Sequence, residues 1–438
     1  MKWFYRLWWL TLFFKLVLAS TLPLAADEAY YWFWSHRLQW SYFDHPPMVA
    51  VLFWLGHAFE NWGSAIRIPG VLLGHATLLV WWRLLRDRLR PEALQVWFWL
   101  SILTPLIGFG SLVITPDLPL LFFWALSILA FERALQQKVA IWYLALGVFL
   151  GLGFCSKYHI VLLVPSLLLY LTFEKKWPQV TFRFVPLTIV AGLLGSFPVL
   201  YWNATHDWQS FRFQLEHGLG RDHYQVEWTL GYIVGQLLLF GPLLIPAFVR
   251  GVRARDLRLF TWNSLFVWLF FLYSSFKSVV EGNWPIIAQP TAFAVCAAGT
   301  KDRKWVRWTC GFWVFLGILT ATHWYHPWIP GVPDKLNEAH EYRSLVPLTK
   351  RYEPLFANTY QMASLLSFET KKPIYKLYDM SRFDFYDQIP ESRPTSGVFY
   401  LIKRQGQNLP KWIREGHNVR ESVENVQPDF EVIRIKLL

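Results

Sequence analysis

Long apolar runs alternate with short polar segments along the first three quarters of the chain. Many of these runs approach or exceed the roughly 20 residues that cross a bilayer core as a helix. Trp and Tyr residues gather near the ends of the runs, where aromatic belts form at a membrane surface. The pattern predicts about eleven membrane helices, and the fifth and sixth are short enough to leave a merged or re-entrant arrangement open. The predicted helices cover residues 3–23, 66–85, 93–111, 118–135, 141–155, 160–173, 184–202, 228–249, 259–276, 285–298 and 306–323.

The pattern changes after Trp328, where the long apolar runs stop. The rest of the chain shows short strand-like and helical patterns, and its length is sufficient to bury a modest core. We expect strands at 373–377, 397–403 and 430–435, and helices near 361–369 and 410–415. The sequence therefore predicts an all-α polytopic membrane domain followed by a small extracytoplasmic α/β domain. The membrane domain covers residues 1–328, with outer loops at 24–65, 203–227 and 276–284, and the α/β domain covers 329–438.

Composition excludes a soluble enzyme. Hydrophobic residues make up 54% of the 438 residues and charged residues only 16%, whereas soluble domains carry about 25% charged residues. The three cysteines, Cys155, Cys296 and Cys310, all lie inside apolar runs. Their spacing indicates neither a metal site nor a disulfide framework, so we interpret them as core residues.

The net charge of +12 is explained by membrane topology rather than by nucleic-acid binding. Basic residues cluster in every second loop, as the positive-inside rule predicts for cytoplasmic loops. This alternation places the N-terminus in the cytoplasm, and an odd number of spans places the C-terminal domain outside. The basic start followed by Leu24-Ala25-Ala26 also resembles a cleaved secretory signal. We favour a retained first helix, because Lys15 interrupts that apolar stretch and many spans follow.

The acidic, aromatic segment 27–47, DEAYYWFWSHRLQWSYFDHPP, lies between two long apolar segments. It holds four groups that can act as acids, bases or ligands at a membrane–water boundary: Asp27, Glu28, Asp44 and His45. Carboxylates beside a bilayer are costly and usually mark function. We expect one of them to be a general base and another a metal ligand or phosphate organiser. The alternative is a solvated helix boundary or cap.

Further polar groups lie on the same predicted side of the membrane. Asp117 follows Thr115-Pro116 and is also well placed to cap a helix. Lys157 could neutralise a phosphate that enters from the bilayer, or extend to lipid headgroups. Lys277 and Glu281 share this ambiguity and could pair with each other. A metal cluster is a further interpretation for five residues whose spacing matches no strong signature, namely His206, Asp207, His217, Asp222 and His223.

Several of these segments together resemble a known family. The chain contains DEAYYWFW, SYFDHPP, ITPDLPLLFFWAL, GLGFCSKYHIVLLVPSLLLY, YWNATHDWQSFRFQLEHGLG and EGNWP in this order. This set is similar to the family 39-like bacterial branch of the dolichyl-phosphate-mannose–protein mannosyltransferase superfamily, which has the GT-C fold. The resemblance covers about residues 20–300, and the tail from FANTYQ to FDFYD resembles the family's outer soluble domain.

The resemblance implies transfer of a sugar from a polyprenyl-phosphate donor at the outer face of the bacterial cytoplasmic membrane. Asp27 matches the acidic residue taken as catalytic, with Glu28 beside it. Asp44-His45-Pro46 matches a segment that reads Glu-Lys-Pro in the lipid A aminoarabinose transferases, where the acid contacts a metal and the lysine contacts the lipid phosphate. The resemblance therefore implies a divalent metal at Asp44 and His45.

Histidine is largely neutral near pH 7, so other cations are better candidates for the donor phosphate. We assign this role to Lys157, Lys277 and Arg37. The remaining groups on the outer side are expected to bind substrate: Asp117, Tyr158, His206, Asp207, Glu281, Asn283 and Trp284.

The expected activity is a glycosyl transfer that inverts the anomeric centre, since direct displacement needs no covalent enzyme intermediate. The expected acceptor is lipid A, lipopolysaccharide or another envelope glycan, with protein second. The alternatives are a transporter or flippase of lipid-linked sugars and a non-catalytic scaffold. A transporter should carry ionisable groups near mid-bilayer and repeated halves, whereas the candidate groups here lie in outer loops and no repeat is evident.

Overall fold

The computed structural model describes residues 2–220, 224–332, 334–416, 418–426 and 429–437. The chain divides into two compact units, and each is described by itself. The first unit contains residues 1–21 and 40–320, and the second contains residues 22–39 and 321–438. The predicted boundary at 328 therefore lies close to the observed one, whereas residues 22–39 group with the C-terminal unit rather than with the membrane helices.

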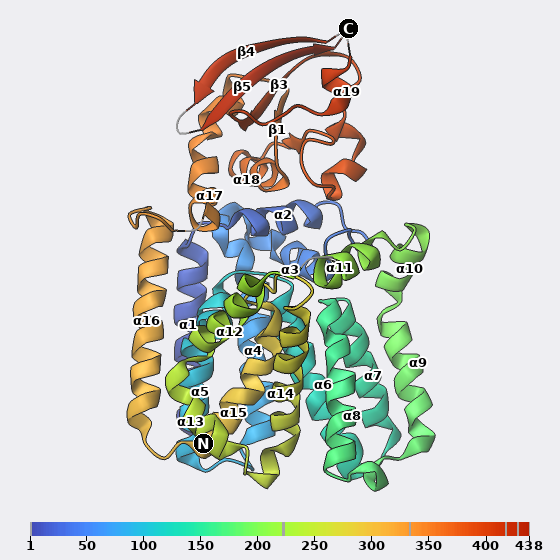
Figure 1. Ribbon diagram of the computed structural model, residues 1–438, viewed down its shortest axis with the longest axis vertical. Coiled ribbons are helices and arrows are strands. Elements are labelled where there is room, and N and C mark those ends of the chain that lie inside the picture. The colour runs from blue at the N-terminus through green and yellow to red at the C-terminus, as the bar shows by residue number, and fades with distance from the viewer. Residues whose placement is uncertain (1, 221–223, 333, 417, 427–428, 438) are drawn as a thin grey trace. The chain divides into compact units, whose positions relative to one another are not determined.

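The first unit is helical throughout (Figure 1). Every one of the predicted apolar runs contains a helix. The α-helices are α1 (Lys2–Thr21), α3 (Met48–Gly56), α4 (Ile68–Leu85), α5 (Pro91–Leu103), α6 (Asp117–Gln137), α7 (Ala140–Phe154), α8 (Leu163–Phe173), α9 (Val185–Gly195), α10 (Phe197–Thr205), α11 (Gln209–Leu219), α12 (Val226–Phe240), α13 (Ile245–Gly251), α14 (Arg258–Ser274), α15 (Gln289–Gly299) and α16 (Arg303–Tyr325), the last of which continues into the second unit. Helices α3 and α11 lie in segments that the sequence pattern predicts as loops.

Three of the predicted runs are broken rather than straight. The chain bends by 61° between α5 and the helical turns at Pro105–Leu112, by 56° between Phe182–Gly195 and α10, and by 71° between α12 and Pro242–Gly251. A proline follows each break within two residues, and proline lacks the N–H that would continue the helical hydrogen bonds. At the third break Gly241 has φ +91°, which a side chain would disfavour.

Two helical segments among the described residues are long and apolar enough to cross a membrane, Met48–Leu85 and Asp117–Gln137. The number rises to six when each of four bent helix pairs counts as one span. The fold is thus mostly helical and suited to a membrane, while the predicted number of about eleven spans stays a prediction.

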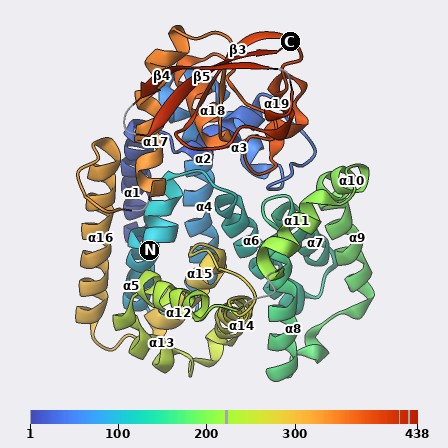
Figure 2. The same cartoon turned by 45° about the horizontal axis from the view of Figure 1, so that its top comes forward.

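Glycines bring α7 and α9 into close contact, and this packing fixes the end of α7 (Figure 2). A Cβ atom on Gly147 would lie 2.3 Å from the carbonyl oxygen of Thr188, and one on Gly151 would lie 2.6 Å from that of Gly192. Small residues at such spacing let membrane helices approach each other closely. The chain leaves α7 at Cys155 and enters the turn that carries Lys157.

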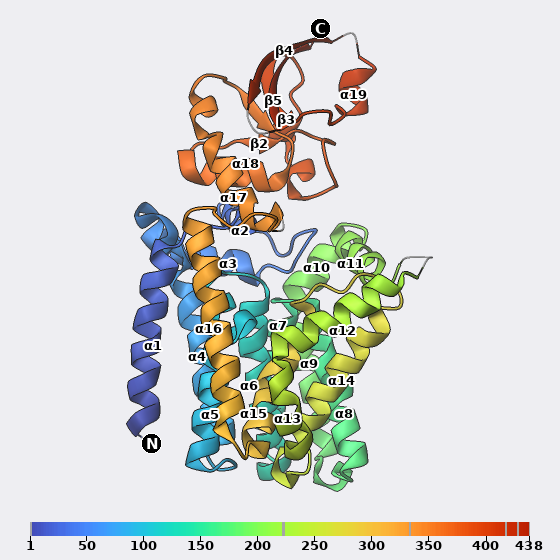
Figure 3. The same ribbon diagram turned by 60° about the vertical axis from the view of Figure 1, so that its left-hand side comes forward.

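The second unit is built on a five-stranded mixed sheet, seen beside α18 in Figure 3. The strands are ordered β2-β1-β3-β5-β4, with β1 parallel to β2 and β3, and β5 antiparallel to β3 and β4. Its elements are α2 (Ala26–Ser35), α17 (Asp334–Ser344), β1 (Leu355–Ala357), α18 (Tyr360–Thr370), β2 (Tyr375–Lys376), β3 (Gly397–Arg404), α19 (Lys411–Arg414), β4 (Val419–Val426) and β5 (Phe430–Leu437).

The three predicted strands and two predicted helices of this unit are confirmed. The sequence pattern missed β1, which has three residues, and β4, whose side chains are mostly exposed. An exposed edge strand shows no alternation between apolar and polar residues, because neither of its faces is buried. The pattern also missed α17, whose residues are predominantly polar.

The segment at 27–47 is not a continuous loop, since its first part forms α2. The helix places a row of aromatic rings against the C-terminal part of the unit: Trp32 lies 5.2 Å from Phe368 and Phe33 lies 4.6 Å from Tyr386, measured between ring centroids. The Tyr30 hydroxyl accepts a hydrogen bond of 2.9 Å from the Phe385 amide. Aromatic residues that the sequence suggested as membrane-interface groups thus form part of a packed core.

Candidate active site

Asp117 begins α6 but does not cap it with its side chain. Its carboxylate instead accepts two hydrogen bonds from distant parts of the chain, one from Lys157 Nζ at 2.7 Å and one from Asn283 Nδ2 at 2.6 Å. The carboxylate also lies in the first helical turn, where the helix dipole favours negative charge. Three residues that the sequence singled out separately therefore form one cluster, which we call the Lys157 cluster.

Lys157 lies in the turn between α7 and the helical turn Tyr158–Leu162. Its side chain is 8% exposed, and that of Asp117 is 7% exposed. A lysine buried in this way does not extend to lipid headgroups, so that interpretation is wrong. The ammonium group carries three N–H donors, and within the described part of the chain it makes a single hydrogen bond, to Asp117. Two donors are left for another acceptor.

The segment 276–284 contributes its C-terminal end to the cluster. Asn283 binds Asp117, and the Trp284 ring lies 5.9 Å from that of His159. Lys277 and Glu281 are both exposed. In the described part of the chain they form no ion pair with each other, so the suggestion that they pair is not supported.

Asp44 and His45 lie in a segment held against the end of α7 and against α11. The Met48 amide donates to the carbonyl oxygen of Cys155 at 3.0 Å, and Gln214 Nε2 donates to the carbonyl oxygen of Asp44 at 2.8 Å. Asp44 is buried, and His45 is close enough to His159 to interact with it electrostatically. These contacts bring the segment to the same turn that carries Lys157.

Two of the other predicted substrate-binding residues, Tyr158 and His206, are engaged by neighbouring side chains. The Tyr158 hydroxyl shares a 2.8 Å hydrogen bond with Ser210. His206 stacks on Trp202 with ring centroids 4.1 Å apart and hydrogen-bonds the carbonyl oxygen of the same residue. Asp207 is exposed. Asp222 and His223 lie outside the described residues.

A mainly apolar cavity of about 180 Å³ adjoins the Lys157 cluster. Asp117 and Asn283 are among its lining residues, so one part of the wall is polar. The remaining lining is mostly aliphatic and comes from α4, α6 and the segment 106–115. Sequence reasoning missed these lining residues, because an aliphatic side chain that lines a cavity has the same pattern as one that faces lipid or another helix.

The other predicted catalytic and phosphate-binding residues belong to the second unit. Glu28 is fully buried, and its Oε2 accepts a hydrogen bond of 3.0 Å from the Ala25 amide, so it does cap α2. Asp27 is exposed, and its Oδ1 accepts a 3.4 Å hydrogen bond from the Tyr360 hydroxyl.

Arg37 is engaged within the second unit. It forms an ion pair of 2.9 Å with Glu391 and donates to the Tyr375 hydroxyl at 3.1 Å. The hydrogen bond from Arg37 holds the pKa of Glu391 below its usual value. A role in binding the donor phosphate stays a prediction for this residue.

A second carboxylate, which sequence reasoning missed, interacts with Asp27. Burial raises the pKa of Glu338 to about 7, and the charge of Asp27 adds to this shift. The Tyr342 hydroxyl donates a 2.8 Å hydrogen bond to Glu338, and this bond lowers the pKa of Glu338 and so partly offsets the effect of burial. Glu338 lies in the predominantly polar α17, where nothing in the sequence distinguishes it from its charged neighbours.

The residues expected to hold a metal are Asp44 and His45. In the described part of the chain, neither belongs to a group of three His, Cys, Asp or Glu ligand atoms within 4.8 Å of one another. A magnesium ion is commonly held by only one or two carboxylates together with substrate phosphates and water. The divalent metal at Asp44 and His45 therefore stays a prediction.

Comparison with known proteins places this geometry in context. Residues 44–202 match the family described as dolichyl-phosphate-mannose-protein mannosyltransferase. The lipid A galacturonosyltransferase RgtD of Rhizobium johnstonii is 26% identical over 298 residues, which are 64% of this chain and 61% of that protein. The undecaprenyl phosphate-alpha-4-amino-4-deoxy-L-arabinose arabinosyl transferase of Edwardsiella ictaluri is 26% identical over 344 residues, which are 67% of this chain and 59% of that protein. The chain thus spans about three fifths of each relative.

Two crystal structures of ArnT from Cupriavidus metallidurans share the fold. The form bound to undecaprenyl phosphate has a TM-score of 0.70 at 13% identity and covers 99% of this chain and 98% of its own. The apo form has a TM-score of 0.69 with the same coverage. The resemblance seen in the sequence is confirmed: the chain is similar to the dolichyl-phosphate-mannose-protein mannosyltransferase family and to a lipid A galacturonosyltransferase, and it has the polytopic GT-C fold of ArnT.

Proposed function

We propose that this protein is a glycosyltransferase of the bacterial inner membrane. It moves a sugar from a polyprenyl-phosphate donor to a lipid or glycan of the cell envelope. The observation that carries the proposal is the Lys157 cluster, in which a buried ammonium group with unused donors is held beside a mainly apolar cavity.

The donor class follows from this juxtaposition. A polyprenyl phosphate joins an apolar chain to an anionic headgroup, so its site needs an apolar wall and a cation close together. The 180 Å³ cavity supplies the wall for part of the chain. Lys157 does not line the cavity itself, but its ammonium group is bonded to Asp117, which does, and it supplies the cation.

The two unused donors of Lys157 are suited to the leaving group. When the bond between sugar and phosphate breaks, negative charge grows on the phosphate oxygens. Donors that are already oriented stabilise such charge more effectively than water does, because they need no reorganisation. Asp117 and Asn283 are positioning residues in this account, since one carboxylate fixes both the ammonium group and the segment that ends in Trp284.

We assign the general base to Asp27. Its carboxylate is exposed, accepts a 3.4 Å hydrogen bond from the Tyr360 hydroxyl and interacts with Glu338. An exposed carboxylate can take a proton from an acceptor hydroxyl. General-base catalysis contributes typically about 10²–10⁴-fold in rate. Direct attack of that hydroxyl on the anomeric carbon, with the polyprenyl phosphate leaving from the opposite face, inverts the configuration.

We take lipid A or another lipopolysaccharide sugar as the acceptor, with protein as a weaker candidate, because one of the relatives named above is a lipid A galacturonosyltransferase. The N-terminus is proposed to lie in the cytoplasm and the second unit in the periplasm. Metal dependence stays a prediction, and full activity after exhaustive chelation would remove it.

The experiment uses the full chain solubilised in detergent, with a polyprenyl-phosphate sugar and lipid A as substrates and mass spectrometry as the readout. A detergent micelle does not separate two compartments, so transport cannot be observed in it. Formation of a covalent bond between the sugar and the acceptor therefore requires catalysis and excludes a pure transporter. We expect transfer by the native protein and loss of transfer in Lys157→Gln, with Lys372→Gln, at an exposed lysine of the second unit, as a matched control that keeps its activity. An active Lys157→Gln protein would remove the proposed phosphate site, and absence of transfer with every donor and acceptor pair would remove the function.

A further inference from the structure

A strongly basic cavity of about 710 Å³ lies in the first unit, away from the Lys157 cluster. It is formed by the start of α5, the ends of α13 and α15 and the start of α16, at the lower end of this unit in Figures 1 and 3. Asn283 is followed by the helical turn Trp284–Ala288 and then by α15, which ends at Gly299. The two sites therefore lie at opposite ends of a segment that includes all of α15, roughly 16 Å of helix.

Two glycines create this cavity by allowing α13 and α15 to touch. A Cβ atom on Gly251 would lie 1.9 Å from the carbonyl oxygen of Val295, and one on Gly299 would lie 2.0 Å from that of Ala247. Arg250 Nε donates to the carbonyl oxygen of Gly299 at 2.9 Å and joins the two helix ends. This contact brings the basic residues that follow both helices to one place.

The charge of the cavity is not compensated. Its lining carries five cationic side chains and one acidic side chain, Arg90, Arg250, Arg253, Lys301, Arg303 and Glu92. Within the described part of the chain, none of these five cations forms an ion pair. No side chain caps the N-terminus of α5, so its first amides also face an anion favourably.

A second polar cavity on the same predicted side provides the contrast. It has a volume of about 840 Å³ and is lined by six cationic and four acidic residues. Its charges pair internally: Arg88 with Glu132 at 2.8 Å and Arg258 with Glu174 at 3.8 Å. The positive-inside rule accounts for the basic residues at both cavities. It does not explain why, among the described residues, cations form ion pairs at the 840 Å³ cavity and not at the 710 Å³ cavity.

We propose that the cavity at Arg253 and Lys301 binds the phosphate of an anionic phospholipid from the cytoplasmic leaflet. Basic pockets between membrane helices on the cytoplasmic side suit such headgroups. The position at the ends of membrane helices favours a lipid over a free anion, because the headgroup and the helix ends lie at the same depth. The bound lipid would hold α5, α13, α15 and α16 together at this end.

The test compares two double variants that each remove one lysine and one arginine charge. Arg253→Gln with Lys301→Gln changes the uncompensated cavity, and Lys176→Gln with Arg255→Gln changes the compensated one. The full-length protein is titrated in detergent with phosphatidylglycerol, phosphatidylcholine or inorganic phosphate, and thermal unfolding reports binding. We expect phosphatidylglycerol to stabilise the native protein and the first variant to bind it about tenfold or more weakly. The second variant should bind it as the native protein does.

Three results would overturn the proposal. Equal weakening in both variants would show a general effect of positive charge. Equal stabilisation by phosphatidylcholine would show that the headgroup charge is irrelevant. Stabilisation by millimolar inorganic phosphate equal to that by phosphatidylglycerol would show a site for a free anion rather than for a lipid.

Discussion

Each unit of this protein contains a buried lysine that is paired with carboxylate, and the two differ in how fully the ammonium group is used. In the second unit, Lys376 Nζ donates to Asp384 at 2.7 Å, to Asp387 at 2.6 Å and to the carbonyl oxygen of Arg382 at 2.8 Å. In the first unit, Lys157 Nζ donates to Asp117 alone among the described residues. An ammonium group has three N–H donors, so Lys376 has none left and Lys157 has two.

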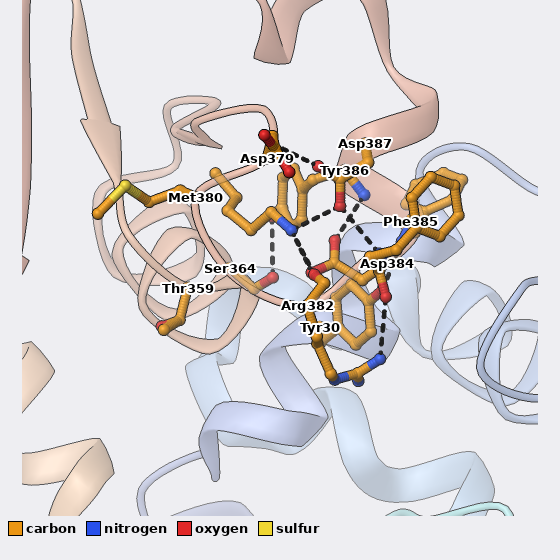
Figure 4. Close-up of polar contacts among 12 residues, drawn as sticks. Tyr30, Thr359, Ser364, Asp379, Met380, Arg382, Asp384, Phe385, Tyr386 and Asp387 are labelled. Atoms are coloured by element: carbon orange, nitrogen blue, oxygen red, sulfur yellow. Dashed lines mark hydrogen bonds and ion pairs between the residues drawn. The ribbon is translucent and has the colours of Figure 1, made fainter. Parts of the chain in front are cut away.

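The residues around the two lysines differ in the same way. The carboxylates of Asp384 and Asp387 also accept backbone amides, and Tyr386 hydrogen-bonds Ser364 beside them, so the whole network is satisfied (Figure 4). The Lys157 cluster adjoins a cavity. A buried charge with every partner present fixes a fold, whereas one with free donors beside a cavity is suited to a ligand. The comparison therefore assigns a structural role to Lys376 and a binding role to Lys157.

The largest expected effect is on the stability of the second unit. Lys376→Gln would leave two buried carboxylates without their cation, and breaking a buried ion pair in this way costs about 3–5 kcal/mol. Chemical unfolding of the full chain, followed by the fluorescence of the second unit, measures it. Lys372→Gln is the control, because its pair with Glu353 is exposed and such pairs contribute about 1 kcal/mol or less. Equal effects of the two variants would contradict the structural role.

The next effect is on catalysis in the first unit. Lys157→Gln keeps one donor for Asp117 but loses the positive charge, so we expect transfer to fall by about 10²–10³-fold, as for the loss of one donor to a developing oxyanion. The unfolding free energy should change less than in Lys376→Gln, because one buried carboxylate rather than two loses its cation and Asn283 still donates to it. A protein that loses stability and activity in parallel would erase the distinction between the two lysines.

A smaller effect is expected at the residue that positions Lys157. Asp117→Asn removes a charged hydrogen bond of about 1.5–3 kcal/mol, which corresponds to roughly 10- to 100-fold in kcat/KM. Asp117→Glu keeps the charge and should recover part of the activity, which a purely structural role at the start of α6 would not require. If Asp117→Asn kept more activity than Asp117→Glu, this would count against the positioning role of Asp117.

The last effect is on the pH dependence of stability and concerns the carboxylate of Glu338 in the second unit. The pKa of Glu338 is raised from its usual value to about 7, so the folded state keeps a proton that the unfolded state has lost. Its contribution to stability is therefore most favourable below about pH 4.5, declines as the pH rises to about 7, and then levels off. Glu338→Gln should flatten the pH dependence of thermal unfolding in this window. A native slope that the variant leaves unchanged would show that another group titrates there.

The sequence predicted the helical runs and the three well-patterned strands, because apolar periodicity is a local property. It also identified Asp117, Lys157 and Asn283, but not that they touch, since 40 and 166 residues separate Asp117 from its two partners. Aromatic residues of α2 look the same whether they face lipid or a core, so the sequence did not reveal that α2 belongs to the second unit. Lys376 was not recognised at all, because its partners, too, are visible only in the fold.

The most direct measurement is the affinity of the detergent-solubilised protein for undecaprenyl phosphate and for undecaprenol, which lacks the phosphate. The account predicts that the native protein binds the phosphate at least tenfold more tightly than the alcohol, and that Lys157→Gln loses this difference while Lys372→Gln keeps it. A Lys157→Gln protein that still prefers the phosphate to the same extent would contradict the claim that this lysine binds the donor.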